Sequence, residues 1–307
     1  MSYADRLARF ETGAGFIAAL DQSGGSTPGA LARYGIPESA YGTDEEMFDL
    51  IHAARTRVIT SPAFTREHIL ATILFQGTVD RQIAGRGVAD YVWRVKGILP
   101  ILKIDKGLEE ESDGVRLMKP IPGLEDTLAA ALDKGVFGTK ERSVIREANP
   151  VGIARVVDQQ FALAERVVAA GLMPIVEPEN DINAPDKAAT EDLLREQLLT
   201  HLDDLGDRKV ALKLTIPTVD GLWGDLIAHP NVARVVALSG GYTRAEANER
   251  LARNPGLIAS FSRALLEGLT VDQADADFDR MLGESIVSIY AASMAGSSGM
   301  SGLRGAA

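Results

Sequence analysis

The sequence of 307 residues contains no cysteine. Structural disulfides, thiolate-zinc sites, iron–sulfur clusters and a cysteine nucleophile are therefore excluded. Aromatic residues are also few, at 6%, but 46% of the residues are hydrophobic and 24% are charged, which excludes a disordered or fibrous chain. Because disulfides are typical of oxidising compartments and this chain can form none, we expect a cytoplasmic protein.

Positive charge is in deficit as well, since 32 Lys and Arg face 43 Asp and Glu and leave a net charge of −11. Nucleic acids and acidic membranes attract proteins with a positive field, so we expect neither as a partner. A small anionic substrate would require a local basic pocket. No run of about 18 apolar residues exists, and residues 1–12 lack the apolar core of a signal peptide, so no membrane segment is predicted.

Signals for a metal or nucleotide cofactor are missing too. The four histidines are scattered and show no paired spacing. A Gly-x-x-x-x-Gly-Lys-Ser/Thr loop is absent, and the Gly-x-Gly at Gly13 and Gly15 precedes an expected strand, whereas a dinucleotide motif follows one. We therefore interpret these glycines as a turn.

Eight short apolar runs recur along the chain, each ending in a polar residue and followed by helical periodicity. They span residues 16–21, 69–76, 98–103, 136–140, 173–177, 210–215, 235–239 and 257–262. One intervening stripe, from Ile153 to Val168, stops before Gly171, which is typical of a helix followed by a C′ glycine. Alternating strands and helices over about 250 residues predict an α/β fold with a single (β/α)8 TIM barrel. We expect the barrel to occupy residues 1–292 and the Gly-, Ser- and Ala-rich residues 293–307 to form a flexible tail.

In such a barrel, the chemistry lies at the carboxyl ends of the strands. The predicted strand ends carry an unusual number of charged residues, namely Asp21, Lys103, Asp105, Lys140, Arg142, Glu177, Glu179, Lys213 and Arg263. Lys213 has apolar neighbours on both sides, and strand alternation points it into the barrel while Leu212 and Leu214 face the helices. A buried lysine of this kind suits a Schiff-base nucleophile, although a structural ion pair with Glu177 or Glu179 is the alternative.

The other strand ends suggest acid–base groups and phosphate cradles. Glu177 and Glu179 share the inward face of one strand, where two carboxylates either perturb each other or neutralise lysines. The Ser239-Gly240-Gly241 turn and Arg263 follow the last two strands, where this fold often binds phosphate. Residues 21–27, which include Ser23 and Ser26, offer hydroxyl and amide groups before a helix expected near Pro28. Two such cradles on one rim suit a bisphosphate.

Seven of these segments together resemble the class I fructose-1,6-bisphosphate aldolases in their shorter bacterial form. They are residues 18–28, 102–107, 138–140, 175–179, 212–213, 238–241 and 260–263, and the likeness extends from about residue 15 to residue 288. The resemblance implies a barrel enzyme that cleaves fructose 1,6-bisphosphate into dihydroxyacetone phosphate and glyceraldehyde 3-phosphate without a metal or other cofactor. As partners we expect a small sugar bisphosphate and further copies of the same chain in a homo-oligomer.

By this resemblance, Lys213 forms the imine, Glu177 is its acid and base, and Lys140 and Glu179 tune that pair. Asp21 is expected to act on the C4 hydroxyl. The resemblance assigns Ser239, Gly240, Gly241 and Arg263 to the C1 phosphate, and Ser23, Ser26, Lys103 and Arg142 to the C6 phosphate.

One departure concerns the second phosphate, because many family members carry a base where this chain has Gly29 and Ala30, and its next base is Arg33. Two alternatives stay open. One is the same chemistry on another sugar phosphate, such as tagatose 1,6-bisphosphate or a transaldolase-like transfer. The other is a non-catalytic barrel that binds phosphorylated metabolites.

Overall fold

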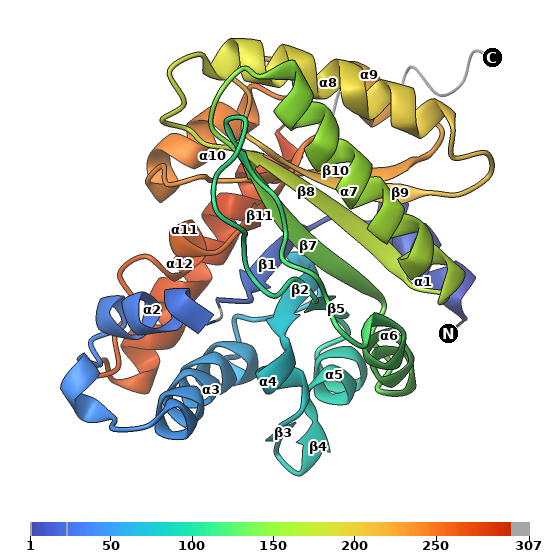
Figure 1. The fold of residues 1–307 in the computed structure, drawn as a ribbon. Helices are drawn as coiled ribbons and strands as arrows, with labels where there is room; N and C mark the ends of the chain where they lie inside the picture. The colour runs from blue at the N-terminus through green and yellow to red at the C-terminus, as the bar shows by residue number, and fades with distance from the viewer. Residues whose placement is uncertain (1, 23, 296–307) are drawn as a thin grey trace.

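The computed structural model describes residues 2–22 and 24–295 (Figure 1). Within them, eight parallel strands form a closed barrel in chain order, because β11 pairs with β1 and β5 pairs with β7. These strands are β1 (Phe16–Leu20), β2 (Ile69–Phe75), β5 (Leu99–Lys103), β7 (Gly138–Ile145), β8 (Met173–Asn180), β9 (Val210–Thr215), β10 (Val232–Leu238) and β11 (Ile258–Phe261). The predicted (β/α)8 barrel is confirmed, and all eight predicted runs contribute a strand.

Helices connect the strands and cover the outside of the barrel (Figure 1). They are α1 (Tyr3–Thr12), α2 (Thr27–Arg33), α3 (Asp44–Thr60), α4 (Gln76–Val79), α5 (Val88–Asp90), α6 (Leu124–Asp133), α7 (Pro150–Ala169), α8 (Lys187–Asp203), α9 (Gly224–Ala228), α10 (Arg244–Ala252), α11 (Arg263–Leu266) and α12 (Asp275–Met294). Helix α7 begins at the side-chain cap of Asn149 and is followed by Gly171 at φ +83°, as the stripe predicted. None of the helices in the described part of the chain is long and apolar enough to cross a membrane.

Three short strands lie in the connections. A hairpin of β3 (Gln82–Ile83) and β4 (Arg86–Gly87) projects from the body in Figure 1. Strand β6 (Val115–Arg116) pairs antiparallel with the end of β7, so it fastens the long connection between β5 and α6 to the barrel.

Strand alternation separates two apolar layers. Outward residues such as Phe16, Leu102 and Leu212 pack against the helices. Inward residues such as Ile17 and Ile175 fill the barrel interior near the amino-terminal ends of the strands. Helix α1 joins this inner cluster through Phe10, whose ring lies 5.3 Å from that of Phe137.

Strands β7 and β8 are longer than the sequence pattern indicated. The apolar runs end at Lys140 and Glu177, but the two strands pair residue by residue as far as Ile145 and Asn180. The prediction that strand four ends at Lys140 is therefore wrong, because backbone pairing with β8 and β6 continues through polar residues. As a consequence, Arg142 and Glu179 lie inside strands and not in loops.

The C-terminal boundary also differs from the prediction. Ser293 and Met294 belong to α12, and the Ser293 hydroxyl accepts a hydrogen bond from the Ala259 amide at 3.0 Å. Residues 296–307 of the predicted tail lie outside the described residues.

Candidate active site

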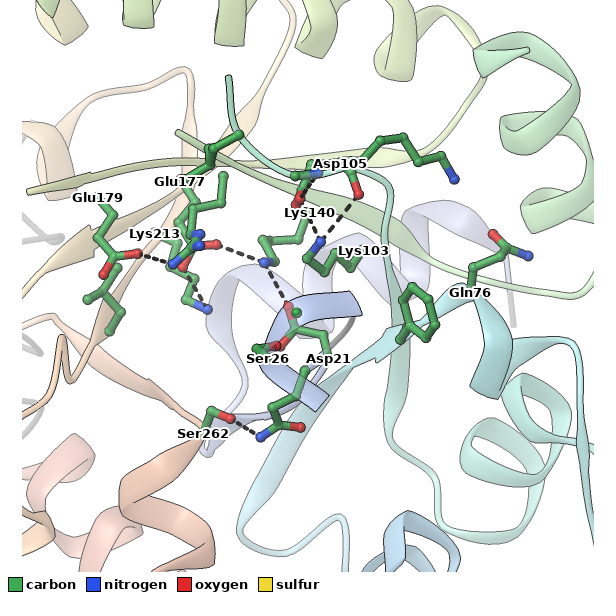
Figure 2. Close-up of a pocket in the computed structure, with 18 of the residues that line it drawn as sticks. Asp21, Ser26, Gln76, Lys103, Asp105, Lys140, Glu177, Glu179, Lys213 and Ser262 are labelled. Carbon is green, nitrogen blue, oxygen red and sulfur yellow. Dashed lines mark hydrogen bonds and ion pairs between the residues drawn. The ribbon is translucent and has the colours of Figure 1, made fainter. Parts of the chain in front are cut away.

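A cavity of about 1220 Å³ opens at the carboxyl ends of the barrel strands. Eleven of the thirteen predicted site residues line it, namely Asp21, Ser26, Lys103, Lys140, Arg142, Glu177, Glu179, Lys213, Ser239, Gly240 and Arg263. Figure 2 shows the lysines and carboxylates of this set pointing toward one another from different strands. Gly241 adjoins the cavity, and Ser23 lies outside the described residues.

Four buried charged side chains form an alternating series in the cavity floor. The ammonium Nζ of Lys213 lies 2.9 Å from Oε1 of Glu177, and Oε2 of the same carboxylate lies 2.9 Å from Nζ of Lys140. The Lys140 ammonium lies 2.7 Å from Oδ2 of Asp21. All four residues are at most 8% exposed. Water therefore cannot stabilise their charges, and the neighbouring side chains of opposite charge must do so.

The local sequence explains why these side chains meet. Lys213 follows Ala211 on the inward face of β9, and Glu177 follows Ile175 on the inward face of β8. Ala211 and Ile175 are paired in the parallel ladder, so the next inward residues, two positions further, also face each other. Alternation and register therefore place the lysine beside the carboxylate.

Strong pKa shifts accompany this arrangement. Burial alone would raise the pKa of Asp21, but the charges of Lys140, Lys213 and Lys103 outweigh it and hold the pKa well below its ordinary value. Burial alone would lower the pKa of Lys140, but the flanking carboxylates Asp21 and Glu177 raise it above its ordinary value. Asp21 is therefore ionised and Lys140 protonated near neutral pH.

Two further ion pairs flank the series. Lys103, the register partner of Lys140, lies 2.6 Å from Oδ1 of Asp105. Burial lowers the pKa of Lys103, and the Asp105 charge opposes that shift. Arg142 donates to Oε2 of Glu179 at 2.9 Å, but burial still raises the Glu179 pKa above its ordinary value. Glu177 and Glu179 therefore have different partners, although they are two residues apart on one face.

The predicted turn after β10 adjoins the predicted arginine. Gly240 has φ +62° and Gly241 has φ +133°, conformations that favour glycine. A Cβ at Gly241 would lie 3.4 Å from Nη2 of Arg263, so the turn and the guanidinium are immediate neighbours. Backbone and guanidinium donors are thus grouped at the mouth, an arrangement suited to an anion.

Sequence reasoning missed two buried residues next to the site. Arg55 of α3 is 3% exposed, donates to Thr78 Oγ1 at 2.7 Å and also donates to the Gln22 carbonyl, directly after Asp21. Burial lowers its pKa to about 10. Its position between Ile51 and Val58 on the buried stripe of α3 was the available signal, because a charge there needs a partner.

Glu141 is the second buried residue that the sequence patterns did not reveal. It lies on β7 between Lys140 and Arg142, faces the opposite side of the strand and has no exposed surface. Burial, together with the nearby Asp105 charge, raises the pKa of its carboxyl well above the ordinary value. The α7 residue Gln160 donates to the Glu141 carbonyl at 3.4 Å and to the Glu177 carbonyl at 3.3 Å, which ties β7 to β8 behind the site.

Across residues 2–22 and 24–295, no three His, Asp or Glu side chains are grouped so that they could hold a metal ion.

The chain is similar in sequence to known proteins over nearly its whole length. No family model matches it. The fructose-bisphosphate aldolase class 1 of Synechocystis sp. is 57% identical over 291 residues, which cover 94% of this chain and 97% of that protein. Those of Clostridium acetobutylicum and Porphyromonas gingivalis are 55% and 52% identical over 290 residues, again 94% of this chain and 98% and 99% of theirs.

A solved structure supports the fold. Fructose-bisphosphate aldolase from Plasmodium falciparum, crystallised with TRAP and a small-molecule inhibitor, aligns with a TM-score of 0.75. The alignment covers 96% of this chain and 95% of that one, at 21% sequence identity.

The fold is a (β/α)8 barrel with a lysine-bearing mouth, and the named relatives identify the chain as a carbon–carbon lyase. Relatives above 50% identity cover nearly the entire chain. The chain belongs to the class 1 fructose-bisphosphate aldolases.

Proposed function

We propose that this enzyme reversibly cleaves fructose 1,6-bisphosphate into dihydroxyacetone phosphate and glyceraldehyde 3-phosphate through an imine on Lys213. The observation that carries the proposal is the buried series Lys213, Glu177, Lys140 and Asp21, with successive contacts of 2.9, 2.9 and 2.7 Å. A nucleophilic lysine needs an adjacent group that can accept and return protons. The Glu177 carboxylate lies within hydrogen-bonding distance of the Lys213 ammonium.

Imine formation uses Lys213 and Glu177. Glu177 accepts a proton from the Lys213 ammonium, and the free amine attacks the C2 carbonyl to give a carbinolamine. Glu177 then returns a proton to the C2 hydroxyl, which leaves as water, and the protonated imine remains. Lys140 contacts the same carboxylate, so it holds Glu177 in place and offsets its charge when ionised.

Carbon–carbon cleavage follows from the protonated imine. Asp21, kept ionised by the neighbouring lysines, accepts the proton of the C4 hydroxyl as the C3–C4 bond breaks. The bonding electron pair moves into the imine to form an enamine, and glyceraldehyde 3-phosphate leaves. Protonation at C3 and hydrolysis of the imine then release dihydroxyacetone phosphate, and Lys213 and its neighbours return to their starting state.

The remaining predicted residues bind the substrate phosphates or adjust the electrostatic field around Glu177. Ser239, Gly240, Gly241 and Arg263 are assigned to the C1 phosphate, and Ser23, Ser26, Lys103 and Arg142 are predicted at the other end of the substrate. Glu179, bonded to Arg142, sets the field beside Glu177. In this scheme the imine is the electron sink, so no metal or other cofactor is required. Cytoplasmic location and homo-oligomeric assembly stay predictions.

Borohydride trapping tests the imine directly. With dihydroxyacetone phosphate present, imine formation expels water and reduction gives a stable secondary amine. The peptide that contains Lys213 should therefore gain the mass of dihydroxyacetone phosphate less one oxygen atom, and activity should be lost in proportion. Lys209→Met is the matched control, because Lys209 precedes β9 and pairs with Glu11 outside the cavity. Trapping on another lysine, or loss of activity on treatment with a chelator, would contradict the mechanism.

A further inference from the structure

Arg55 of α3 is a buried cation that has no counter-ion. The residue is 3% exposed, and no carboxylate lies within 4.0 Å of its guanidinium among residues 2–22 and 24–295. The buried lysines Lys140 and Lys213, by contrast, each contact a carboxylate. Burying a charge without such a partner costs free energy, and an apolar side chain of similar size would fill the same space at lower cost. Packing alone therefore does not account for an arginine at this position.

The guanidinium of Arg55 joins two connections at the mouth of the barrel. Its Nη2 donates to the backbone carbonyl of Gln22, the residue directly after Asp21. Its Nη1 donates at 2.7 Å to Oγ1 of Thr78, which lies in α4 directly after β2. The planar fork of the guanidinium holds both acceptors in a fixed geometry. Arg55 thus ties the backbone after β1 to the neighbouring connection and to α3.

Gln22 is held from its other side as well. Its side-chain amide donates to Oγ of Ser262, which directly precedes α11, and Figure 2 draws this bond as the dashed line to Ser262. Strand β1 pairs with β2 on one side and with β11 on the other. The two bonds of Gln22 therefore fasten the end of β1 toward both neighbouring strands.

The position of Asp21 depends on this fastening. The ladder of β1 with β2 ends at the pair of Leu20 and Leu74, so Asp21 lies just beyond the paired residues. The Gln22 carbonyl, bonded to Arg55, is a fixed point one residue further along. Burial lowers the pKa of Arg55 to about 10, and the negative charge of Asp21 opposes that shift. The guanidinium is therefore protonated near neutral pH and attracts the Asp21 carboxylate through space.

We propose that Arg55 is a positioning residue that holds Asp21 in place to accept the proton of the substrate's C4 hydroxyl. The inference rests on the proposed aldolase function, in which Asp21 acts during carbon–carbon cleavage. Arg55 does not line the catalytic cavity, so it acts through the Gln22 backbone and through its charge. Proton transfer requires hydrogen-bonding distance, so a displaced base lowers kcat more than it weakens substrate binding.

This role separates two steps of the reaction. Imine formation uses Lys213 and Glu177 and does not involve Asp21, so it should not depend on Arg55. Cleavage of fructose 1,6-bisphosphate uses Asp21 and should depend on Arg55 strongly. Condensation of the two triose phosphates should depend on it equally, because Asp21 returns the same proton in the reverse direction. A residue that only stabilises the fold would not distinguish these steps.

The test measures cleavage of fructose 1,6-bisphosphate and borohydride trapping of dihydroxyacetone phosphate on Lys213 in the same Arg55→Met protein. The kcat for cleavage should fall by about 100-fold, whereas KM and the rate of trapping should stay within about 2-fold of the wild type. Condensation should fall by the same factor as cleavage. Urea denaturation shows whether each variant is folded under the assay conditions.

Two milder variants and a control accompany it. Arg55→Lys keeps a cation that can donate to the Gln22 carbonyl and should recover about 10-fold of the lost kcat, and Thr78→Val, which removes the other acceptor, should lower kcat by about 5-fold. Arg57→Gln is the matched control on the same helix, because Arg57 pairs with Asp275 and lies outside the cavity. It should leave the ratio of cleavage to trapping unchanged even if it lowers stability.

The outcomes separate this inference from the proposed function. If the wild-type enzyme cleaves and traps but the ratio of cleavage to trapping stays constant in the Arg55 variants, the positioning role is overturned and the mechanism stands. Equal losses of cleavage and trapping also overturn it, because Arg55 would then support the whole site. If Arg55→Met does not fold, the lysine and valine variants decide by the same ratio. Failure of the wild-type enzyme to trap an imine on Lys213 refutes the proposed function itself.

Discussion

The two halves of the barrel interior are built on the same strands and the same inward face, but they differ completely in chemistry. At the amino-terminal end, Ile17, Ile175 and Ala211 pack into an apolar cluster with Phe10 of α1. Two residues beyond Ile175 and Ala211, and four beyond Ile17, the same end of the barrel carries the buried charges of Glu177, Lys213 and Asp21. One end stabilises the fold by excluding water, and the other keeps ions away from water, which costs free energy unless every ion is paired.

This difference teaches where substitutions should separate activity from stability. Changes at the apolar end should affect folding alone. Changes at the charged end should affect activity first, and stability only when a charge loses its partner. Four substitutions test that division.

Lys213→Met has the largest expected effect. Without an amine no imine forms, so kcat should fall by about 10⁴-fold or more. Glu177 keeps its contact with Lys140, so the free energy of unfolding should change by no more than about 1 kcal/mol. Steady-state kinetics and urea denaturation measure the two quantities. Lys209→Met is the control, and a fully active Lys213→Met protein would refute the role of this lysine.

Lys140→Met should lower both the activity and the stability of the enzyme. Asp21 loses its closest cation and Glu177 loses one of two, so buried negative charge is left without a partner. The free energy of unfolding should fall by about 3 to 5 kcal/mol, and kcat by at least about 100-fold. Lys134→Met, which breaks only a half-exposed pair with Asp80, should change stability by less than about 1 kcal/mol. Equal effects of the two substitutions would contradict the argument.

Phe10→Ala tests the apolar end. Its ring is fully buried, so removal should lower the free energy of unfolding by about 3 kcal/mol or more. The kcat of the folded fraction should stay unchanged, because the cavity lies at the opposite end of the strands. Calorimetry and kinetics at low temperature check this, with exposed Val151→Ala as the control. A selective loss of kcat would show that the two ends are coupled.

Asp21→Asn should show a pH-dependent stability difference. The pKa of Asp21 is lowered in the folded protein, so the stabilisation from its charge is present above the ordinary carboxyl pKa and is lost as the pH falls toward the folded value. The wild type should exceed the variant by about 3 kcal/mol near pH 7, and the gap should narrow below about pH 4. Urea denaturation over this range measures it. Asp207→Asn, at an exposed residue, should show no such gap, and a gap that widens in acid would reverse the sign of the argument.

Much of the fold and the floor of the site could be predicted from local patterns. The inward position of Lys213 follows from alternation within β9, and Gly171 marks the end of α7 by its backbone freedom. The lengths of β7 and β8 could not be predicted in the same way, because ladder pairing continues through polar residues such as Arg142 that look like loop.

The ion-pair partner of each buried charge could not be predicted from the sequence either. Alternation puts Glu177 and Glu179 on one face, but only the packed barrel shows that Glu177 contacts two lysines and Glu179 an arginine. Likewise, Lys103 was predicted as a phosphate ligand, and the structure shows its charge already matched by Asp105.

The sequence by itself determined the class of fold, the lysine that can act as nucleophile and the turns suited to phosphate, because these depend on strand period, residue type and backbone freedom. Tertiary structure alone decided which charges are compensated and which are free, since ion pairing depends on distances of a few ångströms between strands far apart in the chain. That distinction separates Glu177, which contacts two lysines, from Glu179, which contacts an arginine on the neighbouring strand.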